Sequence, residues 1–222
     1  NLVEAAYMLA IAKSHRASSD RDLVRRQAPP DDNRAQVSAA VQREGGAVRL
    51  QIDFLVMSAG TLETDGGVGQ SQQSQRGSIE AASVQKQLRV NGVPHRTSEM
   101  VGEINAVMFS AQDLELVLGS PVVRRRHLDI LISQINPRYL KALQRYRRVV
   151  SQRNHLLKTV KEGRARPGEL DFWDDELSET GGYIMSRRAA TVVALSQQAG
   201  AIHRELTGNG EGLELVFRPS VD

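Results

Sequence analysis

The chain has 222 residues, 40% hydrophobic and 25% charged, which is enough to bury a substantial core and argues against a disordered protein. No apolar run approaches the roughly 20 residues that a membrane helix needs, so a soluble protein is expected. Cysteine is absent, which excludes disulfides, thiolate nucleophiles and cysteine-type zinc sites and fits a cytoplasmic location. The five histidines have no spacing suited to a metal site.

The first half of the chain predicts a helix followed by antiparallel strands. Residues 1–13 have the apolar spacing of a helix. Two alternating segments, 35–44 and 47–56, flank Gly45 and Gly46, which predicts a hairpin. Residues 58–82 are rich in Ser, Gln and Gly, and we expect a flexible insertion there.

Order is expected to return after this insertion. Asn91-Gly92 between two short alternating segments predicts a second hairpin. The run "INAVMFS", residues 104–110, is typical of a buried strand.

The second half of the chain has helical periodicity from Pro121 onward. Pro137 interrupts the pattern, and a longer helix with a heptad-like seam follows, in which Arg153 is the one polar seam residue. A second seam runs from Ile184 to Leu206. The acidic residues 163–182 between the seams predict a connector, and the whole predicts an antiparallel helical arm.

These patterns predict an α/β fold class with three parts. Residues 1–120 form a partial α/β lobe, 121–208 a helical arm, and 209–222 the start of a strand that returns to the lobe. The chain begins in a helical pattern without a cap and ends on an alternating segment, so a piece of a longer protein is expected.

Charge is unevenly distributed although the formal net charge is only +3. Residues 124–166 hold thirteen Lys/Arg and two acids, a balance of +11, whereas residues 167–180 hold six acids and no Lys or Arg. A cationic surface of this kind is typical of phosphate contact, and a solvated charged helix is the alternative. The candidate DNA-binding residues are Arg124, Arg125, Arg126, Lys141, Arg145, Arg147, Arg148 and Arg153.

No complete catalytic constellation is present in the sequence. The run "GGVGQSQ" lacks the Lys-Ser/Thr of a phosphate loop. The acids at 171–176 match no calcium-loop spacing and are better explained as a solvated linker, so no metal site is expected.

Several motifs together resemble the RecF family. They are "FSAQDLELVLGSPVVRRRHLD" at 109–129, "QRNHLLK" at 152–158, the opening "NLVEAAYMLAIAKSHR", "RVNG" and "FRPSV", in the family's order. The resemblance covers the chain except for residues 58–82. It implies an ABC-type ATPase lobe similar to the SMC head, with an inserted antiparallel helical arm.

The resemblance also implies an ATP-dependent, homodimeric DNA-binding protein that uses ATP and Mg²⁺ and acts with RecO and RecR in gap repair, replication restart and the SOS response. The phosphate-binding loop would end just before Asn1, and the signature and Walker B motifs would follow Asp222. The chain alone is therefore not expected to bind ATP stably or to hydrolyse it.

Three residues are implied to lie near the nucleotide. They are Asn1, Arg16 in an arginine loop, and Gln112 at the position of the ABC Q-loop. Ala111 and Gln112 stand where the family has Pro and Glu, and His127 stands where it has Phe. Two other functions stay open, a non-catalytic nucleic-acid-binding coiled-coil protein and another SMC-like or RecN-like ATPase.

Overall fold

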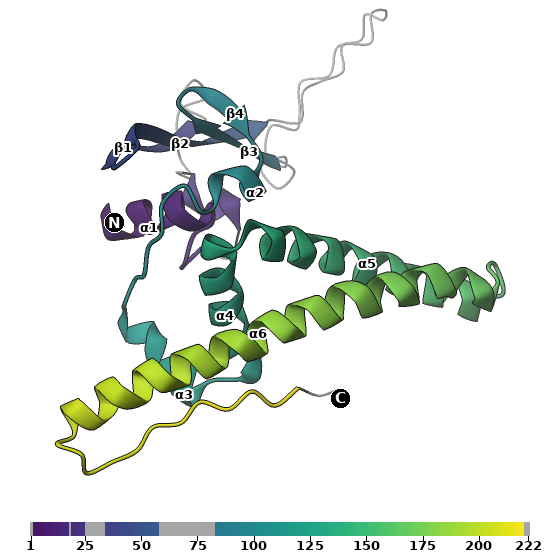
Figure 1. Cartoon of the computed structure of the whole chain (residues 1–222). Coiled ribbons are helices and arrows are strands. Elements are labelled where there is room, and N and C mark those ends of the chain that lie inside the picture. The colour runs from purple at the N-terminus through teal and green to yellow at the C-terminus, as the bar shows by residue number, and fades with distance from the viewer. Residues whose placement is uncertain (1, 18, 25–33, 58–82, 220–222) are drawn as a thin grey trace, which may run out of the picture. The chain divides into compact units, whose positions relative to one another are not determined.

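The computed structural model describes residues 2–17, 19–24, 34–57 and 83–219 (Figure 1). It divides into two units, Asn1–Met108 and Phe109–Asp222, so the boundary lies before the one predicted at residue 120. Asn1 and the predicted insertion 58–82 lie outside the described residues.

The first unit holds a short helix, four strands and small helical turns. Its elements are α1 (Leu2–Ile11), η1 (Asp20–Leu23), β1 (Arg34–Arg43), β2 (Gly46–Met57), β3 (Ser83–Val90), β4 (Val93–His95) and α2 (Thr97–Met100). The strands form one antiparallel sheet in the order β1-β2-β3-β4, which confirms both predicted hairpins. Gly46 and the Asn91-Gly92 pair have positive φ at the two turns, as tight hairpins require.

The core of the first unit lies between one face of the sheet and α1. Val48, Leu50, Ile52 and Phe54 alternate along β2 and are at most 2% exposed. Helix α1 contacts β1 and β2 and buries Met8, Leu9 and Ala10.

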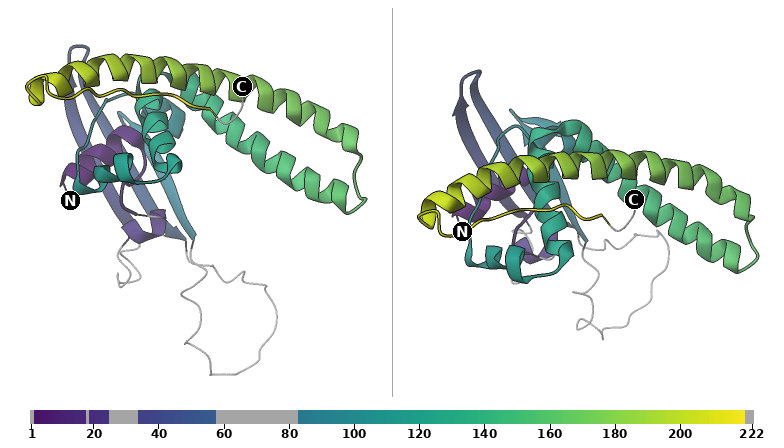
Figure 2. Two further views of the ribbon diagram at one scale, coloured as in Figure 1. Left: turned by 90° about the horizontal axis from the view of Figure 1, so that it is seen from below. Right: turned by 60° about the horizontal axis from the view of Figure 1, so that its bottom comes forward.

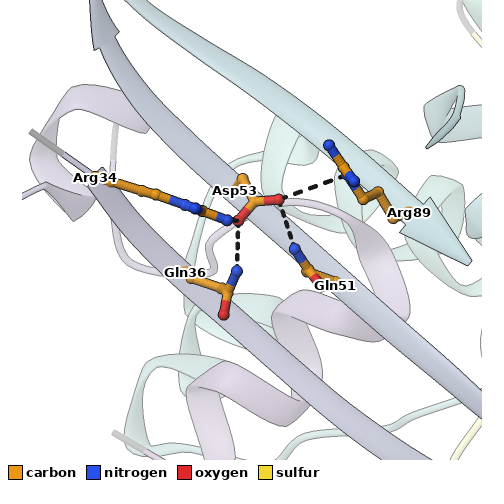
Figure 3. A network of polar contacts seen from close by, with 5 residues as sticks. All are labelled: Arg34, Gln36, Gln51, Asp53 and Arg89. Carbon is orange, nitrogen blue, oxygen red and sulfur yellow. Dashed lines mark hydrogen bonds and ion pairs between the residues drawn. The ribbon is translucent and has the colours of Figure 1, made fainter. Parts of the chain in front are cut away.

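The opposite face of the sheet is polar and is centred on Asp53 of β2 (Figure 3). Asp53 is 2% exposed, and its Oδ1 accepts hydrogen bonds from the Arg34 guanidinium at 2.5 Å and the Gln36 amide at 2.7 Å. Its Oδ2 accepts one from the Gln51 amide at 2.7 Å and lies 3.9 Å from Arg89 Nε. These partners come from β1, β2 and β3, so this carboxylate joins three strands.

Burial by itself raises the pKa of Asp53. The hydrogen bonds from Arg34, Gln36 and Gln51 and the Arg34 charge outweigh burial, so the pKa lies below its usual range. The carboxylate is therefore ionised throughout the neutral pH range.

The second unit is helical. Its elements are η3 (Ala111–Leu114), α3 (Glu115–Leu118), α4 (Pro121–Ile135), α5 (Pro137–Lys161), η4 (Pro167–Leu170) and α6 (Asp171–Leu206). Pro121 and Pro137 each open a helix, where the missing N–H costs nothing, and Asn136 caps α5 by accepting from Tyr139 N. Helices α5 and α6 run antiparallel side by side, as predicted (Figure 2).

The acidic segment is helical where the sequence predicts a connector. The prediction extended the connector to residue 182, whereas α6 begins at Asp171. The acidic residues of this segment lie in helix α6 and form ion pairs with arginines of α5, instead of lying in a solvated connector.

Two predicted strands are not formed among the described residues. Residues 104–110 have neither helix nor strand, and Val107 and Phe109 are 85% and 90% exposed. Residues 211–219 are also irregular, although Leu215 N donates to Ser196 Oγ of α6. Both segments alternate as strands do, but a strand needs a neighbour for its backbone hydrogen bonds, and no described strand pairs with either one.

Three helices meet at a buried polar cluster in the second unit. Asp129 of α4 accepts two hydrogen bonds from Arg188 Nη2 of α6, at 2.8 and 2.9 Å, and one from the Tyr139 hydroxyl of α5 at 2.5 Å. Arg188 and Asp129 side chains are 15% and 11% exposed. Ile132, Leu143 and Ile184 form the apolar core of the same region.

The cluster explains why Arg188 interrupts the apolar seam of α6. Burial and the neighbouring Asp129 raise the pKa of Tyr139 above its usual range, because the phenolate would face a carboxylate. Burial lowers the pKa of Arg188, but Asp129 outweighs it and the net shift is upward. Arg188 thus stays charged while the Tyr139 hydroxyl stays protonated.

Within the described part of the chain, no helix is long and apolar enough to cross a membrane.

We predict that Asp129→Ala lowers the free energy of unfolding of the second unit by about 3 kcal/mol, because it leaves Arg188 buried without a counter-charge. Tyr139→Phe removes one hydroxyl bond and costs about 1 kcal/mol. Trp173 is the only tryptophan and lies in α6, so its fluorescence during urea unfolding reports on this unit. Arg145→Gln, which breaks an exposed ion pair, is the control. An equal loss of unfolding free energy in Asp129→Ala and Arg145→Gln would contradict a special role for the buried cluster.

We also predict a pH dependence of the first unit that runs through Asp53. A carboxyl group whose pKa is lowered by folding stabilises the folded state above its unfolded pKa of about 3.9, and this stabilisation is lost as pH falls through the folded pKa. Asp53→Asn should therefore speed amide exchange in β2 at neutral pH, with a difference from the parent that shrinks below about pH 4. A difference that is constant down to pH 2 would mean that the charge of Asp53 does not matter.

Candidate nucleic-acid interface and nucleotide-facing residues

The loop that follows α1 is held by the buried hydroxyl of Ser14. Ser14 is 2% exposed, accepts hydrogen bonds from the backbone N–H groups of Arg16 and Ala17 at 3.1 and 2.9 Å, and donates to Glu4 at 3.1 Å. Ala12 has a φ of 52°, which turns the chain at the end of the helix. The Arg16 side chain is exposed. The loop thus fixes the backbone of Arg16 and leaves its guanidinium open to a ligand.

Gln112 lies in the second unit, in the short turn η3. The turn is capped by Asp113, whose Oδ2 accepts from the backbone N of Ser110 at 2.6 Å. Gln112 itself is exposed. Arg16 and Gln112 therefore belong to different units, and each is available to a ligand in its own surroundings.

Arg124 accounts for one of the three cations at the start of α4. Its guanidinium donates to the carbonyl oxygens of Gly119 at 2.9 Å and Leu116 at 3.3 Å, at the end of α3. A cation there satisfies carbonyl groups that a helix end leaves without partners. Arg124 is thus a C-terminal cap for the preceding helix, whereas Arg125 and Arg126 are exposed.

Two predicted DNA-binding arginines on α5 are paired with the acidic turns of α6. Arg145 makes a two-pronged contact with Glu176, at 2.6 and 2.5 Å, and Arg153 pairs with Asp174. Hydrogen bonding to these carboxylates raises the pKa of both guanidinium groups. Phosphate would have to displace a carboxylate at each of these two residues.

The other three predicted DNA-binding cations of α5 are exposed. Lys141, Arg147 and Arg148 are exposed, and no ion pair to a described residue involves any of them. Helix α5 contains no acid, and Lys141, Arg148 and His155 recur every seven residues on its exposed side. We call Arg125, Arg126, Lys141, Arg147 and Arg148 the unpaired cations.

No group of three or more acidic, histidine or cysteine side chains among the described residues is placed to hold a metal ion.

The known proteins that match this chain in sequence and in structure include RecF proteins. No protein-family model matches the chain. The DNA replication and repair protein RecF of Chloroflexus aggregans is 39% identical to this chain, and the match covers the whole of this chain and 54% of that protein. RecF of Bacillus cytotoxicus is 36% identical over the whole chain and 51% of its own length. The chain belongs to the RecF family. It spans about half the length of the curated relatives it matches.

Solved RecF structures show the same fold. Two structures of the recombination mediator protein RecF in the RecFOR pathway, one described as RecF-ATPrS and one as RecF-ATP, match with TM-scores of 0.72 and 0.73. They share 24% and 23% identity and cover 93% and 99% of this chain, which spans 48% and 54% of theirs. The predicted α/β class with an antiparallel helical arm is consistent with this shared fold.

The sequence patterns did not reveal the side chains that hold the Arg16 loop and the sheet in place. Ser14 lies in "KSHR", and serine hydroxyls commonly hydrogen-bond the backbone a few residues on in turns. Asp53 stands alone among apolar residues in "QIDFLV", where a buried acid demands a partner. The partner itself, Arg34, lies nineteen residues away and follows only from strand register.

We predict that Ser14→Ala frees the arginine loop. The variant removes the acceptor of two backbone N–H groups, so the amides of Arg16 and Ala17 should exchange with solvent faster. Hydrogen exchange read by NMR measures this directly. Ser19→Ala, which removes a hydroxyl bonded to Asp22, is the control and should leave those two amides unchanged. Unaltered exchange in Ser14→Ala would show that other contacts hold the loop.

Proposed function

We propose that the chain is part of an ATP-dependent, homodimeric DNA-binding mediator that works with RecO and RecR. Its processes would be gap repair, replication restart and the SOS response, in the cytoplasm. The match of the whole chain to proteins named for DNA replication and repair supports this proposal, as does the place of solved RecF in the RecFOR pathway.

The unpaired cations are the proposed DNA surface of this chain. The observation that carries the proposal is that α5 has no acid and keeps Lys141, Arg147 and Arg148 exposed and unpaired, although acids crowd the neighbouring turns of α6. Arginine and lysine at such positions bind backbone phosphates and release counterions. Arg124, Arg145 and Arg153 are weaker candidates because each already has an internal acceptor.

The nucleotide is proposed to bind with Mg²⁺ to the longer protein. The name RecF-ATP of a solved relative supports ATP binding. Within this chain, Arg16 could stabilise phosphate charge and Gln112 could reach the metal or its water, since both side chains are exposed. A phosphate loop just before Asn1 would support an ATPase, and its absence would favour the coiled-coil alternative.

We predict that Arg147→Gln/Arg148→Gln in the full-length protein weakens duplex DNA binding. Each lost phosphate contact should reduce the slope of log K against log salt by about 0.9, so the double variant should lose about 2 units of slope. Fluorescence anisotropy with a labelled duplex over a salt series measures both affinity and slope. ATP binding should stay nearly unchanged.

Arg145→Gln/Arg153→Gln is the matched control on the same helix. It removes the same charge, but from arginines that carboxylates already occupy, so the expected loss of affinity is smaller. Equal losses in the two double variants would mean that net charge alone matters. Binding that salt does not affect would contradict phosphate contact altogether.

A further inference from the structure

The polar face of the sheet in the first unit carries arginines from three strands. Strand register places Arg34 of β1, Arg49 of β2 and Arg89 of β3 on the side of Asp53. Each of them occupies, or is paired with, a position an even number of residues from Asp53 along β2, and such positions share one face. The Arg34 and Arg89 side chains are 54% and 41% exposed, and Arg49 is exposed. The face is therefore open and cationic.

The rest of this face is mostly neutral. Its other polar residues include Ser38 and five glutamines, namely Gln36, Gln42, Gln51, Gln85 and Gln87. Asp53 is the only acid among the paired positions of the face. It is 2% exposed and lies beneath the side chains that donate to it, so solvent meets cations and amides. Three arginines and one buried carboxylate leave the face with a net charge of +2.

Arg49 has a fixed backbone and a free side chain. Its backbone N–H donates to Asn91 Oδ1 at 2.8 Å, and its carbonyl oxygen accepts from the Asn91 N–H at 2.8 Å. The turn between β3 and β4 thus anchors this residue. Within the described part of the chain, no ion pair or hydrogen bond involves its guanidinium. Its N–H donors are available to an external acceptor at a position that is already set.

Arg34 and Arg89 are positioned by Asp53 and keep donors for a ligand. Arg34 donates to Asp53 Oδ1 through Nε and Nη2, at 3.2 and 2.5 Å, and its Nη1 has no acceptor among the described residues. Arg89 approaches from the other side, with Nε 3.9 Å from Asp53 Oδ2, an ion pair longer than a hydrogen bond (Figure 3). Asp53 therefore orients two guanidinium groups whose outer edges remain in solvent.

The spacing of the arginines suits a polyanion better than a small phosphate. Strands rise about 3.3 Å per residue and lie about 4.8 Å apart, so the Arg49 and Arg89 backbones are about 8 Å apart, whereas Arg34 is about 20 Å from Arg49. One small anion meets two of these cations at most. A nucleic-acid duplex has a phosphate for about every 1.7 Å of its axis and offers one to each.

The chemistry of the face also favours a duplex over a single strand. No paired position on this face holds an aromatic residue, so unpaired bases have no ring to stack on. Guanidinium and amide groups donate hydrogen bonds to phosphate and sugar oxygens, which are contacts that do not depend on base sequence.

We propose that the polar sheet face binds the sugar-phosphate backbone of a nucleic-acid duplex through Arg34, Arg49 and Arg89. The proposal rests on the proposed function for the class of ligand. The site itself contains no residue of α5, and it adds a second cationic surface in the other unit of the chain.

Duplex binding by the 222-residue chain, followed by fluorescence anisotropy over a salt series, tests this face. Arg49→Gln leaves the Asp53 network intact and should lower the slope of log K against log salt by about 0.9, since one phosphate contact is lost. Arg49→Gln/Arg89→Gln should lower it by about 1.8.

Arg43→Gln is the matched control on the same hairpin. Arg43 is 49% exposed, but its register places it on the opposite side from Asp53, and it pairs with Glu103 at 3.0 Å. Its loss should leave the slope unchanged. An unchanged slope in Arg49→Gln, or equal losses in Arg49→Gln and Arg43→Gln, would overturn the proposal.

A site-specific label locates the bound duplex. The chain has no cysteine, so a nitroxide on Ser38→Cys reports from the middle of the face, where Ser38 is exposed and paired with Gln51. A short DNA duplex should slow the motion of this label in its EPR spectrum in a saturable way. A label on Ser19→Cys is the control and should be unaffected, because Ser19 is next to Asp20, whose partner Lys86 lies on the opposite face of the sheet.

Two further outcomes of the label experiment count against the proposal. A Ser38 label that the duplex does not slow would overturn it. A poly-glutamate peptide that slows this label as strongly as the duplex would overturn it in favour of an acidic protein partner.

The α5 surface is tested separately in the same anisotropy assay with Arg147→Gln/Arg148→Gln. If that variant binds like the parent while Arg49→Gln loses slope, the α5 surface fails and the sheet face stands. The reverse result overturns the sheet face alone.

Discussion

The bidentate contact of Arg188 with Asp129 decides how the helical unit is built. It joins α4 to α6 in a partly apolar setting, and the Tyr139 hydroxyl adds α5 to the same carboxylate. A buried pair of this kind tolerates little displacement, because either charge alone would be costly. The rotation of α5 about its axis is thereby fixed, and with it the choice of cations that face outward.

The same rotation distributes charge over the arm. The inward edge of α5 presents Arg145 and Arg153 to Glu176 and Asp174, and its outer side keeps Lys141 and Arg148. A strongly basic segment followed by a strongly acidic one is therefore partly self-neutralising. The sequence alone shows the basic and the acidic run, but only the pairing of the two helices shows which cations form internal ion pairs.

Local patterns predicted the elements whose stabilising partners are close in sequence. The glycine and asparagine turns predicted both hairpins, and Pro137 predicted the break between α4 and α5. Prediction failed where a segment depends on a distant partner: the acidic connector became helix opposite α5, and "INAVMFS" did not form a strand. The candidate site shows the same division: Arg147 and Arg148 are exposed as expected, whereas Arg145 and Arg153 pair with carboxylates 31 and 21 residues away in the sequence.

The acidic residues of α6 that pair with α5 would compete with any external polyanion for the same arginines. Asp174 and Glu176 already occupy two arginines, so a polyanion must approach from the α5 side and is repelled from the first turns of α6. Salt weakens the internal pairs as well as external phosphate contacts. Rising ionic strength thus frees Arg145 and Arg153 from their internal carboxylates while it weakens their attraction for an external anion. The two effects oppose each other, and only the α5 side of the arm is attractive to an anion.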